Sequence, residues 1–396
     1  MKLMKLLAVA LLLLSASLVS AQAVTRCGGP TNALYINSPV FHFDVCHTGN
    51  NPYEQLLSPS TVVGLVPDWT FTEAMQLSFP SSPAVVNGVL YIGAAGNSNN
   101  GLYAINARNG TLLWAYPTSY GVLSSPAVSG GVVYVGSWDG NLYALNANSG
   151  ALIWKYSTGG QLTSSPTVVG GIVYFGGGVP DPNVYALNAA TGTLLWRYAT
   201  AAYVNSSPAV VNGIVYIGST DHNVYALNAV TGTLLWKYDT GNQIFESSPA
   251  VFHGVVYIGA DGPGTNVVAL DALTGNVVWT YSAGSSVLSS PAVANGVVYI
   301  RSEDEYLYAL DAATGTLIWN VSTHGNPGSS PTVANGVVYI SSGGGFYAFN
   351  ASTGAVLWKA TNNMGSESTP AVVNGVVYLG TDFFPNQVMA FHLAGH

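Results

Sequence analysis

The sequence predicts an all-β fold: an eight-bladed β-propeller of four-stranded antiparallel blades, closed by pairing of its N- and C-terminal strands. Two markers recur eight times, at steps of 39 to 45 residues. One is a Ser-Ser-Pro motif, Ser-Thr-Pro in the last unit, with prolines at Pro83, Pro126, Pro166, Pro208, Pro249, Pro291, Pro331 and Pro370. The other is a tryptophan, at Trp69, Trp114, Trp154, Trp196, Trp236, Trp279, Trp319 and Trp358. Two independent markers that share one period indicate eight structural repeats, and this period is typical of a propeller blade.

Each unit has the pattern of four short strands joined by tight turns. In residues 206–238 the turns include Asn212-Gly213, because both positions tolerate positive φ, and Thr231-Gly232. The segments between the turns are rich in β-branched and aromatic residues. The expected strands are 206–211, 214–218, 224–228 and 233–238. Four antiparallel strands per unit predict a propeller blade.

Two other repeat architectures fit the pattern less well. A helical solenoid requires apolar residues at the helical period, and no unit has that spacing. A parallel β-helix has shorter coils and lacks the paired hairpin turns seen in every unit. The propeller therefore remains the predicted architecture.

Seven of the repeated tryptophans follow a glycine by four residues. These glycines are Gly110, Gly150, Gly192, Gly232, Gly275, Gly315 and Gly354. A glycine in a turn leaves an open backbone surface, on which a large ring from the neighbouring blade can stack. We therefore expect eight tryptophans to hold the blades together. The ninth, Trp138, lies outside this register.

The two ends of the repeat region complete one blade. The last unit has a third strand near Val388 to Phe391 and no fourth strand. Asp68 to Phe71 has the pattern of a fourth strand with no unit before it. Pairing of these segments leaves no open sheet edge, so closure of the ring is favoured.

The N-terminal residues predict export. Residues 1–23 have a basic start, an apolar run and an Ala21-Gln22-Ala23 cleavage site, which indicate a secretory signal peptide and a periplasmic or extracellular protein. Residues 24–64 are a lead-in segment, and residues 65–396 are the propeller.

The chain has two cysteines, Cys27 and Cys46, and both lie in the lead-in. In an exported chain we expect them to form a disulfide. Two free thiols are the alternative.

Composition restricts the partners. The formal net charge is −8, only 7% of residues are charged and no basic patch occurs, so nucleic acid is not expected as a partner. After residue 23 there is no apolar stretch long enough for a membrane span. We expect a monomer that binds a protein or a small ligand at the mouth of its central channel.

Acidic residues gather in loops that are predicted to share one face, where the loops between strands two and three meet the loops between blades. The candidate binding face consists of Trp138, Asp139, Asp221, Asp261, Glu303, Asp304, Glu305, Asp382 and Glu246; Asp239, His324 and Glu367 add to it. Such a face attracts cations or basic partners. Aspartate also suits tight turns, which accounts for Asp139 and Asp221 better than for the run Glu303-Asp304-Glu305. Trp138 is either a stacking platform for a ligand or an ordinary exposed turn residue.

Three sequence patterns recur among the units, with substitutions at one or more positions: Ser-Pro-Ala-Val-Val-Asn-Gly-Val-Val-Tyr, Leu-Tyr-Ala-Leu-Asn-Ala and Thr-Gly-Thr-Leu-Leu-Trp-Lys-Tyr. They resemble the PQQ-like (quinoprotein-type) β-propeller repeat, and Ala226, Asn228, Thr231, Gly232 and Trp236 match its tryptophan-docking motif. The resemblance covers about residues 69–392, and the lead-in is similar to that of exported, BamB-like members. It implies the propeller fold and a non-catalytic binding or scaffold role, in protein interaction or envelope assembly.

The resemblance leaves an enzyme class open as the alternative, the PQQ-dependent dehydrogenases. Members of that class carry a vicinal disulfide and calcium ligands, whereas the two cysteines here are not adjacent and lie outside the repeats. A hydrolase or lyase is a third class, but no nucleophile elbow, His-Glu-x-x-His or Walker sequence is present. We therefore assign no catalytic residue and expect no cofactor, with PQQ and calcium as the alternative.

His42, Asp44 and His47 are close in sequence and are residue types that ligate metals. Packing of the lead-in on the propeller explains them more simply. No metal ligand is assigned.

Overall fold

The protein, described here from a computed structural model, is resolved in detail for residues 37–38, 40–72, 77–97, 99–325, 328–360, 366–382 and 386–395. The predicted signal peptide at 1–23 and Cys27 lie outside these residues. The Cys27–Cys46 disulfide therefore stays a prediction.

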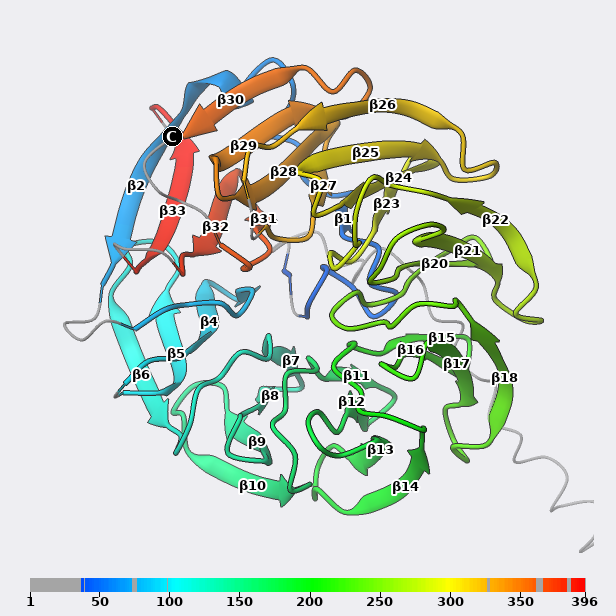
Figure 1. Ribbon diagram of the computed structural model, residues 1–396. Helices are drawn as coiled ribbons and strands as arrows, with labels where there is room; N and C mark the ends of the chain where they lie inside the picture. Colours follow the sequence, from blue (N-terminus) through cyan, green and yellow to red (C-terminus); the bar gives the residue numbers. More distant parts are fainter. Residues whose placement is uncertain are drawn as a thin grey trace, which may run out of the picture.

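Eight blades, each with four antiparallel strands, surround a central axis, as Figure 1 shows, and this confirms the predicted propeller; the sheet of one blade gains a fifth, parallel strand from the lead-in. Blade 1 consists of β3 (Ala84–Val86), β4 (Val89–Ala94), β5 (Gly101–Asn106) and β6 (Leu112–Pro117), and blade 2 of β7 (Ala127–Ser129), β8 (Val132–Gly136), β9 (Asn141–Asn146) and β10 (Leu152–Ser157). Blade 3 consists of β11 (Thr167–Val169), β12 (Ile172–Gly176), β13 (Asn183–Asn188) and β14 (Leu194–Ala199). Blade 4 consists of β15 (Ala209–Val211), β16 (Ile214–Gly218), β17 (Asn223–Asn228) and β18 (Leu234–Asp239).

Blade 5 consists of β19 (Ala250–Phe252), β20 (Val255–Gly259), β21 (Val267–Asp271) and β22 (Val277–Tyr281), and blade 6 of β23 (Ala292–Ala294), β24 (Val297–Arg301), β25 (Tyr306–Asp311) and β26 (Leu317–Ser322). Blade 7 consists of β27 (Thr332–Ala334), β28 (Val337–Ser342), β29 (Gly345–Asn350) and β30 (Val356–Ala360). Blade 8 consists of β31 (Ala371–Val373), β32 (Val376–Gly380), β33 (Val388–Leu393) and, from the start of the propeller, β2 (Leu65–Phe71). The lead-in adds β1 (Asn50–Asn51) and a short 3-10 turn, η1 (Val62–Gly64).

The turns have the conformations that their residues predict. Asn212 and Gly213 join β15 to β16 with φ values of 50° and 77°, the left-handed pair that a two-residue hairpin needs. Strand four of most blades carries a bulge next to its tryptophan, as between Ala226 and Leu227 opposite β18. The bulge bends the outer strand and turns the tryptophan towards the next blade.

The tryptophans dock on the glycine turns as predicted. The Trp196 ring lies so close to Gly232 of the next blade that a Cβ there would be 2.6 Å from the ring. Its Nε1–H donates to the Ala229 carbonyl oxygen (2.9 Å), and the Tyr174 hydroxyl donates to the same oxygen (3.1 Å). The same stacking recurs at all seven predicted glycines. At the seven interfaces with this stacking, each blade is therefore held to its neighbour by apolar contact and by a shared acceptor.

Blade 8 closes the ring. β2 pairs with β33 antiparallel, with Leu65 opposite Leu393 and Phe71 opposite Val388, which confirms the predicted closure. The chain does not make the third-to-fourth-strand turn in this blade. Trp358 of blade 7 therefore donates its Nε1–H to the Leu65 carbonyl oxygen (3.0 Å) and packs on Phe346 and Phe391.

The lead-in crosses the channel at the face of the Asn-Gly turns, where it is the dark blue segment near the centre of Figure 1. We call residues 40–51 the plug. Four of its carbonyl oxygens accept N–H groups from the inner strands of four consecutive blades, at distances of 2.7 to 2.9 Å: Val45 from Val210, Cys46 from Val251, Thr48 from Val293 and Gly49 from Val333. The inner strands are sheet edges, and the plug satisfies their free N–H groups.

Glu54 fastens the lead-in to blade 8. Its Oε1 accepts the N–H groups of Leu56 (2.8 Å) and Leu57 (3.0 Å), and its Oε2 accepts that of Gly375 (2.9 Å). The residue is buried, at 3% exposure. Among the described residues no helix has the length and hydropathy to cross a membrane.

Candidate functional site

A cavity of about 130 Å³ lies on the propeller axis and opens on the face that carries the acidic loops. We call it the cup. Phe41 of the plug lines it from the closed end. The second hydroxyl residue of each repeat motif forms its wall: Ser82, Ser125, Ser165, Ser207, Ser248, Ser290, Ser330 and Thr369. The residue directly before each motif forms its mouth: Pro80, Leu123, Thr163, Asn205, Glu246, Leu288, Gly328 and Glu367.

The wall explains why the motif contains two serines. The first accepts a backbone N–H within its own blade, as Ser206 Oγ does from Gly218 (3.1 Å). The second accepts the backbone N–H of its counterpart in the preceding blade, as Ser207 Oγ does from Ser165 (2.9 Å). Seven such bonds, at 2.9 to 3.0 Å, run around the axis and include the closing bond from Thr369 to Ser82. The cup is therefore rigid and lined by hydroxyl groups.

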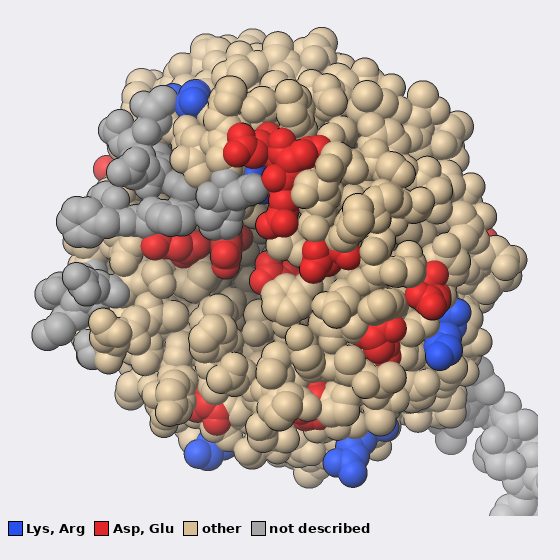
Figure 2. Space-filling model, viewed as in Figure 1, with Lys and Arg blue, Asp and Glu red and all other residues tan. Residues whose placement is uncertain are grey.

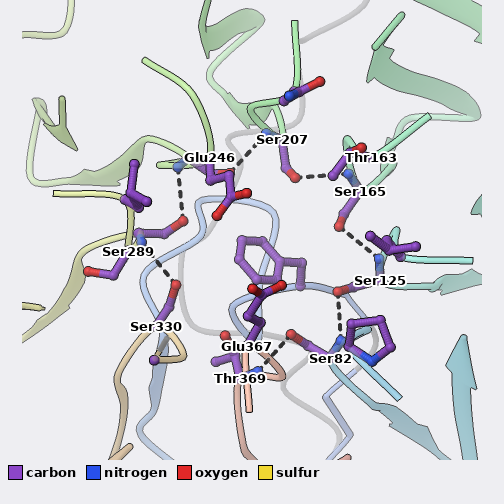
Figure 3. Close-up of a pocket in the computed structure, with 18 residues that line it drawn as sticks. Ser82, Ser125, Thr163, Ser165, Ser207, Glu246, Ser289, Ser330, Glu367 and Thr369 are labelled. Carbon is purple, nitrogen blue, oxygen red and sulfur yellow. Dashed lines mark hydrogen bonds between the residues drawn. The ribbon is translucent and has the colours of Figure 1, made fainter. Parts of the chain in front are cut away.

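Two carboxylates face each other across the mouth. Figure 3 shows Glu246 and Glu367 projecting from opposite sides towards the centre of the cup. Both side chains are exposed to the solvent inside the hollow, although the surrounding blades remove part of their hydration. Desolvation, and then the charges of Glu367, Glu303 and Asp261, raise the pKa of Glu246 to about 7. Desolvation also raises the pKa of Glu367.

The charge of these two glutamates has no cationic counterpart in the lining. None of the described residues that line the cup is basic. The lining of the mouth therefore carries only negative charge whenever the glutamates are ionised.

Asn205 is a buried polar side chain of the mouth whose amide oxygen lacks a hydrogen-bond donor within the described ranges. It is 7% exposed, lines the cup next to the blade that supplies Glu246, and its Oδ1 has no hydrogen-bond partner among the described residues. A buried amide oxygen without a donor costs free energy. A ligand that brings a donor to the mouth would recover that cost.

The outer acids of the candidate face perform a structural task. The Asp221 carboxylate accepts the backbone N–H of Asn223 in its own turn (3.1 Å), the backbone N–H of Ala201 in the preceding interblade loop (2.8 Å) and the Tyr225 hydroxyl (2.6 Å). Desolvation raises the pKa of Asp221, but these bonds outweigh it and lower the pKa overall. Asp139 and Asp304 make the same three kinds of bond. Asp181 holds its own turn in the same way and carried no separate signal in the sequence.

The remaining acids lie nearer the mouth. Figure 2 shows acidic residues around the central hollow and the basic residues mainly towards the rim. Glu303 and Glu305 are exposed, and Asp261 is half-buried. Asp382 accepts the N–H of Glu367 (2.8 Å) and the Ser366 hydroxyl (3.2 Å), which fixes the position of Glu367 in the mouth. Desolvation is the main cause that raises the pKa of Asp382 to about 7.

Arg301 of blade 6 departs from the repeat pattern at the end of strand two. It stands where six other blades have a glycine at the end of strand two, and it is buried. Its guanidinium donates to Thr323 Oγ1 (3.2 Å) and to the Gly325 carbonyl oxygen (2.6 Å), and it packs against Gly328 of the mouth. Arg301 therefore lies behind the wall, where it supports the loop.

Trp138 lies beside the mouth. It is 38% exposed, and its Nε1–H donates to Oγ1 of Thr163, a mouth residue (3.2 Å). Tyr203 and Phe245, in neighbouring interblade loops, form an edge-to-face pair with centroids 6.5 Å apart. The rim of the cup is therefore partly aromatic.

The lead-in residues considered for metal binding contribute to the structure of the plug. Asp44 accepts the N–H groups of Cys46 (3.1 Å) and Thr48 (3.0 Å) and the Thr48 hydroxyl (2.9 Å). Burial lowers the pKa values of His42 and His47 to about 4 and about 3, so both rings are neutral at physiological pH. Across the described ranges no group of three or more His, Cys, Asp and Glu side chains is arranged to hold a metal ion.

Sequence reasoning assigned Glu246 and Glu367 to the candidate face but did not identify the other residues that line the cup. The signal for the mouth was available, because each mouth residue directly precedes a Ser-Ser-Pro or Ser-Thr-Pro motif. Phe41 carried no such signal, because nothing in the lead-in repeats.

Comparison with known proteins places the fold. The family model described as outer membrane protein assembly factor BamB matches residues 67–178, 138–262, 242–329 and 303–395. BamB from Moraxella catarrhalis superimposes with a TM-score of 0.69 at 18% identity, over 84% of this chain and 98% of that chain. No curated protein sequence is significantly similar.

Other solved structures with this fold include both an enzyme and a designed protein. The quinohemoprotein alcohol dehydrogenase ADHIIG from Pseudomonas putida HK5 superimposes with a TM-score of 0.76 at 18% identity, over 91% of this chain and 81% of that chain. The computationally designed Ika8 protein superimposes with a TM-score of 0.68 at 18% identity, over 83% and 100%. At these identities the structures show the fold alone. The family matches, in contrast, run through all eight blades, and the chain belongs to the family of PQQ-like β-propeller repeat proteins described by outer membrane protein assembly factor BamB.

Proposed function

We propose that this protein is an exported, non-catalytic binding propeller that holds a protein partner at the cup. The observation that carries the proposal is the mouth itself, where Glu246 and Glu367 face each other and no described lining residue is basic. A concave site whose lining carries only negative charge attracts a basic group of a partner. The family description supports an assembly role, and the pattern of residues 1–23 supports export.

The dehydrogenase alternative agrees less well with the cup. PQQ is a fused-ring quinone with three carboxylate groups, and the lining offers it two glutamates and no arginine or lysine. The residues present do not suit this cofactor, and we derive no reaction from it.

The proposal is tested by affinity capture from the native envelope or medium. The bait is the mature protein, as wild type and with Glu246→Gln and Glu367→Gln together. The matched control carries Asp271→Asn and Asp311→Asn, which remove the same charge from turns on the opposite face. Asparagine occupies the equivalent position in other blades, for example Asn228, so the control should fold normally.

We expect one set of proteins to be recovered with the wild type and the control and to be lost with the cup variant. Equal recovery by all three baits would contradict the proposal. A quinone absorbance that co-elutes with the protein after addition of PQQ and calcium would favour the dehydrogenase instead.

A further inference from the structure

The shape of the cup limits how a ligand can enter it. The wall is a ring of hydroxyl residues around the axis, and Phe41 lies at the closed end. A partner can therefore reach the floor only through the mouth, and one extended side chain is the part of a protein surface that suits such an entry.

The surfaces of the cup have two different characters. Phe41 lines the closed end, and Leu123, Leu288 and Pro80 give parts of the mouth an apolar surface. Glu246 and Glu367 add negative charge at the same level. An aromatic ring attracts a cation over its face, and apolar walls favour methylene groups. The combination suits an alkyl chain that ends in a cation.

The polar groups of the mouth suit an ammonium group. A primary ammonium has three N–H donors and no acceptor. The mouth has two carboxylates, the Thr163 hydroxyl, which accepts the Trp138 N–H, and the Asn205 amide, whose Oδ1 has no donor among the described residues. Neither Glu246 nor Glu367 forms an ion pair with another described residue.

We propose that the cup binds a primary alkylammonium group, namely the side chain of one lysine of a partner protein, between Glu246 and Glu367 and above the Phe41 ring. This inference deepens the proposed function and depends on it for the identity of the occupant. It adds a role for the lead-in, because the floor of the site comes from the plug and not from the repeats. It also makes Asn205 a specificity residue, since that amide would accept the third ammonium hydrogen.

The first experiment measures binding of n-butylamine to the mature protein by calorimetry at pH 8, with n-pentanol as the neutral control and calcium chloride as the metal control. We expect saturable binding of the amine and none of the alcohol. Binding should weaken at least tenfold in the Glu246→Gln, Glu367→Gln variant and stay unchanged in the Asp271→Asn, Asp311→Asn variant. Phe41→Leu, which keeps the charges, should weaken it about threefold to tenfold, as expected for loss of a cation–π contact.

Three results would overturn the inference: equal binding of amine and alcohol, amine binding that is insensitive to the two glutamates, or displacement of the amine by micromolar calcium. Unchanged thermal unfolding of each variant confirms that a loss of binding is not a loss of fold. A second measurement separates this inference from the proposed function. If saturating butylamine does not displace the captured partner, the cup binds amines but is not the docking site. If the glutamate variant loses the partner while the wild type binds no amine, the docking proposal stands and the lysine inference fails.

Discussion

At seven interfaces between blades, one alanine carbonyl oxygen accepts two hydrogen bonds, from a tyrosine and a tryptophan of the preceding blade. Tyr216 and Trp236 of blade 4 both donate to Ala272 of blade 5, at 3.0 Å each. At the interface between blades 7 and 8 the tyrosine has lost its acceptor, because blade 8 lacks the turn that would supply the alanine. The hydroxyl of Tyr339 is buried and has no hydrogen-bond partner among the described residues.

The pair Tyr216 and Tyr339 allows a matched test of that difference. We expect Tyr216→Phe to lower the free energy of unfolding by about 0.5–1.5 kcal/mol, because it removes a hydrogen bond. Tyr339→Phe should leave it unchanged or raise it by up to about 1 kcal/mol, because it removes an unsatisfied hydroxyl. Urea denaturation of both variants measures the two effects, and equal destabilisation would contradict the assignment of Tyr339 as unpaired.

The raised pKa of Glu246 makes binding of a cation at the cup depend on pH. Because desolvation and the acidic neighbours Glu367, Glu303 and Asp261 raise this pKa to about 7, Glu246 is mostly ionised at pH 8 and mostly protonated at pH 6. An alkylamine stays protonated throughout that range. We expect n-butylamine affinity to fall about threefold to tenfold from pH 8 to pH 6, measured by calorimetry. The Glu246→Gln variant should show a flatter dependence, and an affinity that rises on acidification would refute this explanation.

At the scale of the element, the outer strand and the turn of the next blade form one packing unit. The bulge in strand four directs the tryptophan outward, and the glycine of the following turn leaves room for the ring. Gly275 has a φ of +73°, and a Cβ there would be 2.7 Å from the Trp236 ring. Gly254 has a similar φ of +79°, but a Cβ there would have no atom within 4 Å, so the two glycines differ only in the close approach.

Alanine substitution at these two glycines separates conformation from packing. Gly254→Ala should cost about 1–2 kcal/mol, the strain of a left-handed residue with a side chain. Gly275→Ala should cost about 1–3 kcal/mol more, because the new methyl group forces the tryptophan away from its seat. The free energies of unfolding in urea measure the difference. Similar values for the two variants would show that the ring can shift at little cost.

At the scale of the whole molecule, the lead-in connects blades through hydrogen bonds that the repeats do not make among themselves. The plug pairs with the inner strands of blades 4 to 7. Glu54, which follows the plug in the lead-in, bonds to blade 8, the blade that closes the ring. Removing the Glu54 carboxylate would leave three backbone N–H groups without an acceptor. The plug, the closing blade and the floor of the cup therefore depend on one another.

Substitution of Glu54 tests this dependence. We expect Glu54→Ala to lower the free energy of unfolding by about 3 kcal/mol, because it leaves the buried N–H groups of Leu57 and Gly375 without an acceptor and also removes the acceptor of Leu56. Glu54→Gln retains one oxygen and should cost less. Limited proteolysis should cut the lead-in faster in Glu54→Ala than in the wild type. Wild-type stability and cleavage rates in both variants would contradict the role assigned to Glu54.

The sequence by itself determined the architecture. The strands, the glycine-containing turns and the tryptophan–glycine docking were predictable, because each signal is local and recurs along the chain. The closure by β2 and β33 was predictable because the units at the two ends of the repeat region are each incomplete. The two serines of the motif were visible as well, although their separate tasks were not. The residues that recur make equivalent contacts in most blades, so the structure of one unit predicts that of the others.

Only the tertiary structure decided what the non-repeating residues do. Phe41 lines the cup because the plug binds inner strands that lie some 160 to 290 residues further along the chain, a contact that no local pattern encodes. Asp221 and Glu246 are both acids in loops, yet hydrogen bonds to neighbouring loops occupy the first and closure of the ring turns the second towards Glu367. The physical reason is that a carboxylate's role depends on which donors surround it, and those donors come from other blades.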